Sequence, residues 1–131
     1  MARYLLDADT VSYALRGEGG VAARILEHPP SDLCISSITL AELGFGAAAK
    51  KSQKLRRAIR AFIRDVSVLP FDEVAAERFA AVAAELAESG TPIGALDTLV
   101  AAHALSLGLT VVTNNTRHFG RVRGLRVENW R

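Results

Sequence analysis

Cysteine is almost absent from this chain: its 131 residues include only Cys34. One thiol cannot form an internal disulfide or a cysteine-ligated zinc site, and its neighbours Leu33 and Ile35 indicate a small buried core residue. Long apolar runs are also missing. No run approaches the roughly 20 residues that a membrane-spanning helix needs, and no charged-then-apolar leader precedes the first apolar segment. We therefore expect a cytoplasmic protein without a membrane association.

An excess of one charge sign is missing as well. The 16 Lys and Arg residues nearly balance 14 Asp and Glu residues, and the net charge of +2 is too small to identify a polyanionic partner. Hydrophobic residues make up 50% of the chain, which is ordinary for a globular protein. Because there is also no repeat, linker or low-complexity segment, we expect one domain over residues 1–131.

Hydrophobic periodicity predicts strands that alternate with helices. The expected strands are Tyr4–Asp7, Leu33–Ser36, Val66–Leu69, Leu109–Thr113 and a short one at Leu125–Val127. The expected helices are Ser12–Leu15, Val21–Leu26, Leu40–Ala49, Ser52–Asp65, a long alanine-rich helix from the N-cap Asp72 to about Ser89, and Leu96–Leu107. This alternation predicts an α/β fold in which a mainly parallel sheet of four to five strands lies between two layers of helices.

Three acids stand where such a fold places its ligands. Asp7 closes the first apolar strand, whereas Glu42 and Asp97 lie near the first turns of two later helices. In open α/β sheets the ligand site lies at the carboxyl ends of the strands. Carboxylates gathered there raise each other's pKa, and a bound divalent cation would relieve that repulsion.

Each acid also has a purely structural interpretation. Glu42 follows Thr39 by three residues, so the pair forms a capping box that starts a helix. Asp7 would end its strand or cap the next turn. Asp97 would complement the helix dipole, but its apolar neighbours predict burial on nearly all sides, where an unpaired carboxylate is costly. The conjunction of the three acids favours a functional site.

The opening Asp7-Ala8-Asp9-Thr10-Val11 raises a competing hypothesis. It matches the Asp-x-Asp motif of haloacid-dehalogenase-type phosphohydrolases, in which the first Asp is the nucleophile and the second is the acid and base. Those enzymes also need a lysine and a further acidic pair toward the C-terminus. Here the lysines are confined to residues 50–54 and the only acid after Asp97 is Glu128. A phosphoacceptor receiver domain would lack its lysine in the same way.

Five segments, in order, resemble the PIN-domain toxins called VapC. They are Tyr4–Asp7, Ser36–Leu43, Ile93–Ala104, Val111–Phe119 and Gly124–Trp130. The resemblance covers the chain from end to end and implies a PIN-like domain with metal-dependent endoribonuclease activity, the toxin of a toxin–antitoxin pair. The family acids match Asp7, Glu42 and Asp97. Two positions depart from the family pattern: Asn115 stands where many members carry a fourth acid, which puts a second metal in doubt, and His118 replaces a common Asp or Glu.

The chemistry of hard cations then assigns roles. Mg²⁺ takes oxygen ligands, keeps several waters and is typically held by one or two carboxylates and a substrate phosphate. We expect Asp7 and Asp97 to bind Mg²⁺, with Mn²⁺ as a substitute, and Glu42 to act as a ligand or to orient water. Thr113, Asn114 and Asn115 would line the pocket, while Asp9 either joins it or faces outward.

RNA contacts are expected from basic residues. Arg117, Arg121 and Arg123 lie near the expected pocket in sequence order and are candidate phosphate ligands. A denser run of seven cations, from Lys50 to Arg64, is either a solvated helix surface or part of an RNA surface.

The resemblance also implies partners: a VapB-type antitoxin and either a homodimer or a toxin–antitoxin hetero-oligomer. The branch that it matches best cuts tRNA, so a tRNA is the expected substrate. The alternatives that stay open are a non-catalytic interaction module and the Asp-x-Asp phosphohydrolase.

Overall fold

Five short parallel strands form the centre of the fold. The computed structural model describes all residues, 1–131. The strands are β1 (Tyr4–Leu6), β2 (Leu33–Ser36), β3 (Ser67–Leu69), β4 (Thr110–Val112) and β5 (Val127–Glu128), in the spatial order β3-β2-β1-β4-β5. Every neighbouring pair is parallel. The carboxyl ends of all five strands therefore lie at one edge of the sheet, with the end of β1 in the middle.

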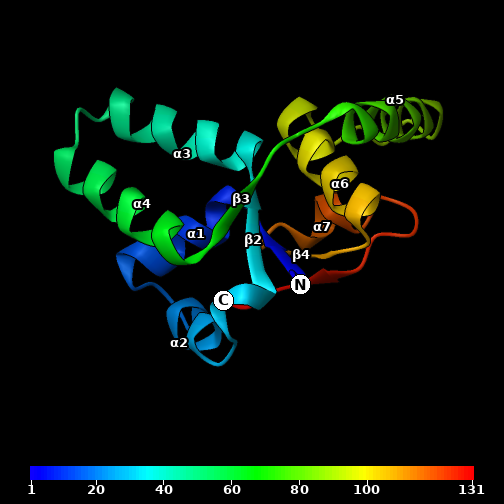
Figure 1. Cartoon of the computed structure of the whole chain (residues 1–131). Helices are drawn as coiled ribbons and strands as arrows, with labels where there is room; N and C mark the ends of the chain where they lie inside the picture. Colours follow the sequence, from blue (N-terminus) through cyan, green and yellow to red (C-terminus); the bar gives the residue numbers. More distant parts are fainter.

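Helices cover both faces of this sheet (Figure 1). On one side lie α1 (Ala8–Arg16), α2 (Val21–Leu26), α3 (Ser37–Ala49) and α4 (Gln53–Asp65), with a 3-10 turn, Pro30–Asp32, before β2. On the other side lie α5 (Glu73–Glu88), α6 (Ala95–Leu107) and the short α7 (Thr116–Phe119). The predicted three-layer α/β/α architecture is confirmed, and the sheet has five strands.

The strands divide their side chains between two cores. Leu5 packs with α5 and α6 residues such as Val100, whereas its neighbour Leu6 packs with Leu43 and Ile59 on the α3–α4 side. This division follows from the alternation of side chains along a strand. Because both faces are covered, the three central strands, β1, β2 and β4, are almost entirely buried. The two helical layers are therefore held apart by a buried sheet whose edge is free to carry polar groups.

An aromatic cluster, formed by Tyr4, His28 and Trp130, closes the α2 side of the sheet. The His28 and Trp130 rings stack at 4.8 Å, and Tyr4 meets the Trp130 ring edge-on at 5.0 Å. The indole N–H of Trp130 donates to Glu128 Oε1 at 3.0 Å. Arg24 lies over the Trp130 ring. These contacts fasten the end of the chain to its beginning.

Two helix starts differ from the predicted ones, for one physical reason. The helix expected from Ser12 begins at Ala8, and the one expected from Leu40 begins at Ser37. In both cases a polar residue at the end of the preceding strand is the N-cap: the Asp7 carboxylate accepts from Thr10 N, and the Ser36 hydroxyl accepts from Ile38 N. Strand and helix thus join without a loop. Asp72 caps α5 as expected, and α7 was not anticipated.

No helix of the structure combines the length and the apolar character needed to cross a membrane.

Candidate metal-dependent nuclease site

Asp7 lies at the carboxyl end of the central strand. Its side chain is 6% exposed, and its Oδ1 accepts a hydrogen bond from Thr10 N at 2.9 Å. Burial raises the pKa of Asp7 to about 6, although hydrogen bonds from Thr113 and Thr10 pull in the opposite direction. The cap expected for Asp7 is therefore present, but burial opposes its negative charge.

Two buried threonines fix Asp7 in place. Thr10 donates its hydroxyl to Val112 O at 3.0 Å, which ties the first turn of α1 to the end of β4. Thr113, which follows β4, is fully buried, hydrogen-bonds to the Asp7 side chain, and accepts from Asn115 N at 2.9 Å. The carboxyl ends of β1 and β4 thus share one hydrogen-bonded arrangement.

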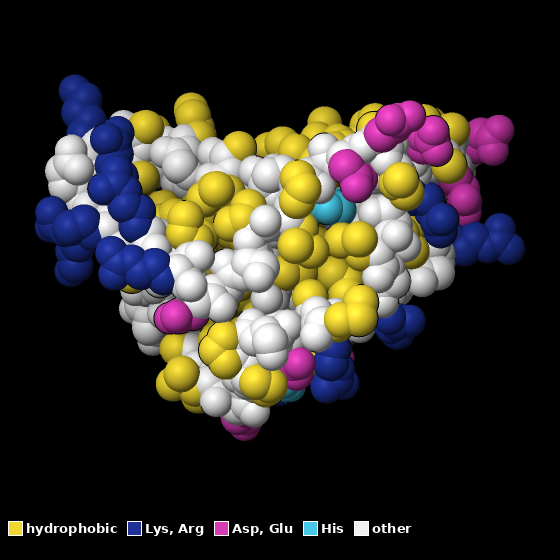
Figure 2. All heavy atoms as spheres, viewed as in Figure 1, with side chains coloured by type: hydrophobic (Ala, Val, Ile, Leu, Met, Phe, Trp, Pro, Cys, Tyr) yellow, Lys and Arg dark blue, Asp and Glu magenta, His cyan; other side chains and the backbone are white.

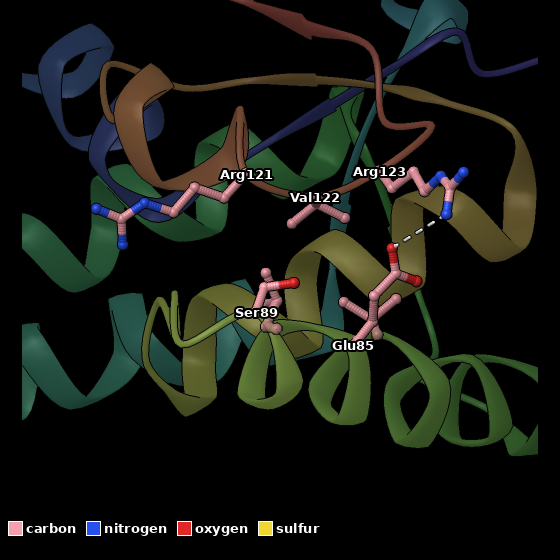
Figure 3. Close-up of a pocket in the computed structure, with 7 residues that line it drawn as sticks. Glu85, Ser89, Arg121, Val122 and Arg123 are labelled. Atoms are coloured by element: carbon pink, nitrogen blue, oxygen red, sulfur yellow. Dashed lines mark ion pairs between the residues drawn. The ribbon is translucent and has the colours of Figure 1, made fainter.

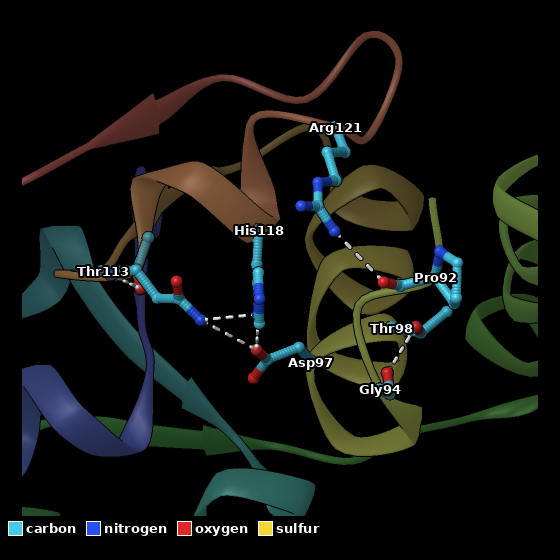
Figure 4. A network of polar contacts seen from close by, with 8 residues as sticks. Pro92, Gly94, Asp97, Thr98, Thr113, His118 and Arg121 are labelled. Atoms are coloured by element: carbon cyan, nitrogen blue, oxygen red, sulfur yellow. Dashed lines mark hydrogen bonds and ion pairs between the residues drawn. The ribbon is translucent and has the colours of Figure 1, made fainter. Parts of the chain in front are cut away.

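Asp97 enters the same edge from the first turn of α6, where Figure 4 shows it facing His118. Its Oδ2 lies 3.3 Å from Asn115 Nδ2 and 3.5 Å from His118 Nδ1, and the latter two atoms are 2.8 Å apart. The burial predicted for Asp97 is wrong: its side chain is 32% exposed, because α6 turns this face toward the open edge. The carboxylate is positioned by neighbours but stays accessible.

Glu42 reaches the site from α3, and its interpretation as a capping-box residue is wrong. The helix begins at Ser37, so Glu42 lies beyond the first turn and cannot reach the helix start. Thr39, the other half of the expected box, is buried and its hydroxyl has no hydrogen-bond partner. Glu42 is only half-buried and makes no ion pair. Capping therefore does not account for this residue.

The carboxylates act on one another. Burial is the main cause that raises the pKa of Glu42 above its ordinary value, followed by the charges of Asp97, Asp7 and Asp9. Acids from α1, α3 and α6 thus approach closely enough to repel, as expected from the sequence. Asp9 itself is exposed in the first turn of α1 and lines a groove together with Glu42.

The donor set fits a hard cation, with one restriction. Apart from the His118 imidazole, the side chains at this edge offer oxygen: carboxylates, the Asn115 amide and the Thr113 hydroxyl, which are the ligands that Mg²⁺ prefers. No three acidic, histidine or cysteine side chains lie close enough together to enclose an ion. A cation here would therefore be held by one or two carboxylates, with water and substrate oxygens completing its shell.

The other predicted residues are more dispersed. Asn114 turns away from the acids: its Nδ2 lies 3.5 Å from the Tyr13 hydroxyl, and its Oδ1 accepts from Asn129. Arg121 donates to Pro92 O at 3.2 Å (Figure 4). Arg123 forms an ion pair with Glu85 at 3.9 Å, beside a small pocket against α5 (Figure 3). Arg117 is exposed and makes no ion pair. The structure does not bring these arginines and the acids into one cluster.

Two positioning contacts were missed in the sequence. His118 bonds to Asn115, three positions earlier on the same helical turn; that spacing was the available signal. His103 is buried and lies 2.8 Å from the Ser36 hydroxyl, so it links α6 to the cap of α3. No sequence pattern indicates that pairing, since its partners are 67 residues apart.

Comparison with known proteins identifies the family. The PIN domain family model matches residues 4–125. The tRNA(fMet)-specific endonuclease VapC of Shigella flexneri is 39% identical over 99% of both chains. The chain belongs to the VapC family of PIN-domain ribonucleases. The Ribonuclease VapC2 of Haemophilus influenzae is 38% identical over 99% of both chains.

Solved VapC structures share the fold as well. The chain superposes on a protein in the DNA-bound VapBC complex from Salmonella typhimurium with a TM-score of 0.89, at 40% identity and full coverage of both chains. VapBC2 from Rickettsia felis, bound to a promoter DNA fragment, gives a TM-score of 0.87 at 31% identity and 98% coverage. Membership in the VapC family removes the phosphohydrolase and receiver-domain alternatives, and the missing lysine agrees with that outcome.

Proposed function

We propose that this chain is a Mg²⁺-dependent endoribonuclease that cuts tRNA, and that it is the toxin of a pair neutralised by a VapB-type antitoxin. Mn²⁺ is the expected substitute for Mg²⁺. The observation that carries the proposal is the convergence of Asp7, Asp9, Glu42 and Asp97 at one edge of the sheet, where burial and then the charges of the other three acids raise the pKa of Glu42. A stable fold gains nothing from that repulsion, whereas a cation-binding site requires it.

The protein's own groups divide the work. Asp7 and Asp97 are the proposed metal ligands, held by Thr113 on one side and by Asn115 and His118 on the other. The cation, when bound, neutralises charge on the scissile phosphate and makes a nearby water more acidic. Glu42, whose pKa is raised by burial and by the neighbouring carboxylates, orients that water and accepts its proton.

Attack by water fixes the products. The water oxygen forms a bond to phosphorus, and the bond between phosphorus and the 3′ oxygen breaks. The fragments then end in a 3′-hydroxyl and a 5′-phosphate. Ribonucleases that use the 2′-hydroxyl as the nucleophile leave a different 3′ end, so end chemistry separates the two mechanisms.

Substrate and partners follow from the relatives. Proteins named tRNA(fMet)-specific endonuclease VapC, from Shigella and Salmonella, are 39% identical to this chain over 99% of its length. A tRNA also suits the site physically, because an anticodon loop offers splayed single-stranded backbone to a narrow edge. Related VapC chains were solved in VapBC complexes, which supports a VapB-type partner and a hetero-oligomer, with or without a homodimer. We further propose that residues 1–131 form a single domain, since one sheet joins strands from Tyr4 to Glu128.

The test is to map RNA ends after a short pulse of expression without the antitoxin. Breaks with 5′-phosphates at one loop position of one or two tRNAs are the expected result. Breaks scattered over messenger or ribosomal RNA would contradict the tRNA assignment alone. If the purified free protein cuts no RNA with either Mg²⁺ or Mn²⁺, a non-catalytic interaction module becomes the better explanation.

A further inference from the structure

A groove between α1, α3 and α4 leads away from the acids. It consists of two adjoining hollows of about 380 Å³ each, which share Arg16, Ser52 and Leu55. Asp9 and Glu42 line the first hollow together with Lys50, and Lys54 lines the second. We name this feature the α1–α4 groove. It connects the candidate active site to the corner where α3 meets α4.

The cations of the α1–α4 groove are available for a ligand. Lys50 and Lys54 are exposed, and neither makes an ion pair. Arg16 is held by the Glu18 carboxylate, with a distance of 2.8 Å from Nε to Oε1, at the surface. Figure 2 shows Lys and Arg side chains gathered at the α3–α4 end of the molecule, while Asp and Glu side chains gather over α5. This separation attracts a polyanion to the groove end.

The corner beside the groove is rigid. Lys51 has a φ of 52°, in the left-handed region where helices usually end with glycine. Lys51 N donates to Ala48 O at 3.1 Å, Ser52 N donates to Ala47 O at 3.0 Å, and the Ser52 hydroxyl caps α4 by accepting from Leu55 N. Lys50 and Lys54 are thus fixed on the two sides of one tight turn. Lys51, a further cation, therefore occupies a position where stability alone would favour glycine.

The lining of the groove indicates which part of an RNA it fits. Its apolar residues are short aliphatic ones such as Ala8 and Leu43, and no aromatic side chain is available to stack on a base. Apart from Asp9 and Glu42 at the end beside the acids, the polar residues are hydroxyls and cations, which contact phosphate and sugar without reading sequence. A polypeptide that brings a basic side chain to the acids would meet repulsion from Arg16 and Lys50.

We propose that the α1–α4 groove binds the sugar–phosphate backbone of the RNA strand next to the scissile phosphate. Lys50 and Lys54 contact successive phosphates, and Arg16 exchanges Glu18 for a phosphate at the junction of the two hollows. This inference rests on the proposed ribonuclease function and adds the direction in which the strand leaves the acids.

The test compares two double variants that each remove two exposed cations. Lys50→Gln/Lys54→Gln changes the groove, whereas Arg60→Gln/Arg64→Gln changes α4 outside the lining of the groove. With the mapped tRNA as substrate, the groove variant should raise KM roughly tenfold at physiological salt and leave kcat unchanged. The plot of log kcat/KM against log salt concentration should become shallower by about 1.4, since each lost single-strand phosphate contact removes about 0.7. Lys50→Arg/Lys54→Arg should restore both values.

Other results would overturn the inference. Equal effects of the two double variants would mean that overall positive charge, and not the groove, determines RNA binding. Unchanged RNA kinetics with weakened antitoxin binding would mean that the groove is a protein-binding surface. Binding is also measured by fluorescence anisotropy, with a labelled single-stranded RNA and Asp97→Asn versions of each protein. That readout needs no cleavage, so loss of binding in the groove variant supports the groove even if the wild-type protein proves inactive. Absence of wild-type cleavage would count against the ribonuclease proposal alone.

Discussion

The aromatic cluster and the acidic edge lie on the same sheet, but the polar groups are paired in the first and repel one another in the second. Around Trp130 the indole N–H has Glu128 as its partner, and the rings contact each other at about 5 Å. At the acidic edge, Asp7 is buried against its own charge and Glu42 is repelled by three other carboxylates. Polar groups that serve only stability have hydrogen-bond partners within the chain. Carboxylates that are held close together although they repel one another indicate a ligand that the chain alone does not supply.

The sharpest test of this contrast is Asp97→Asn. The substitution keeps the shape of the side chain and its contact with Asn115 but removes the negative charge. We expect the cleavage rate to fall roughly 10⁴-fold, because loss of the cation removes several kcal/mol of transition-state stabilisation. The melting temperature should stay the same or rise. Cleavage assays and thermal unfolding of the same preparation measure both quantities.

Undiminished cleavage by a folded Asp97→Asn protein would contradict the site assignment. Glu42→Gln provides a matched comparison: it should also keep its stability, since Glu42 caps no helix, and should lose the proton-accepting role.

Trp130→Ala should show the reverse pattern. Removing a side chain that is 3% exposed, together with its stack on His28, should lower the free energy of unfolding by about 4 kcal/mol. The cleavage rate per folded molecule should not change. Denaturant unfolding and kinetics well below the midpoint separate the two effects. Phe45→Ala is the control, because Phe45 is 75% exposed and its loss should change stability little.

The pH dependence of stability tests directly whether burial disfavours the negative charge of Asp7. Its pKa of about 6 in the folded protein lies above the ordinary value of 3.8, so the native state binds this proton more tightly than the unfolded chain. In the presence of a chelator, stability should therefore rise as the pH falls from about 6 toward 4, by at most about 3 kcal/mol. The comparison is with Asp7→Asn, which can still cap α1. Parallel curves of stability against pH for the two proteins would show that burial does not raise the pKa of Asp7.

Thr39→Val gives the smallest expected effect. Its buried hydroxyl lacks a partner, so the nearly isosteric valine should raise the free energy of unfolding by about 1 kcal/mol. Thr10→Val is the matched opposite, because the Thr10 hydroxyl donates to Val112 O and its removal should destabilise the fold. Chemical denaturation of both variants measures the difference, and a loss of stability in Thr39→Val would mean that its hydroxyl is satisfied.

The sequence predicted the layers, and the position of Asp7 at the end of its strand, for identifiable reasons. Apolar strands such as Leu33–Ser36 and the amphipathic α4 carry their pattern in consecutive residues, and Asp7 is marked by the strand that it ends. Contacts between distant segments leave no such pattern. The pairing of His103 with Ser36 and the exposure of Asp97 depend on how α6 packs against its neighbours. The capping box at Thr39 failed because a different local hydrogen bond, which Ile38 N donates to the Ser36 hydroxyl, starts the helix earlier.

The position of β1 also determines when the nuclease can first exist. This strand begins at Tyr4 but lies between β2 and β4, so one of its two neighbours is made only after residue 110 has been synthesised. Parallel pairing over such a separation forms late in folding. Asp7 obtains its Thr113 contact, and Asp97 its Asn115 contact, only at that step. A nascent or truncated chain therefore carries the acids without the site, and cleavage activity begins only once nearly the whole protein has been made.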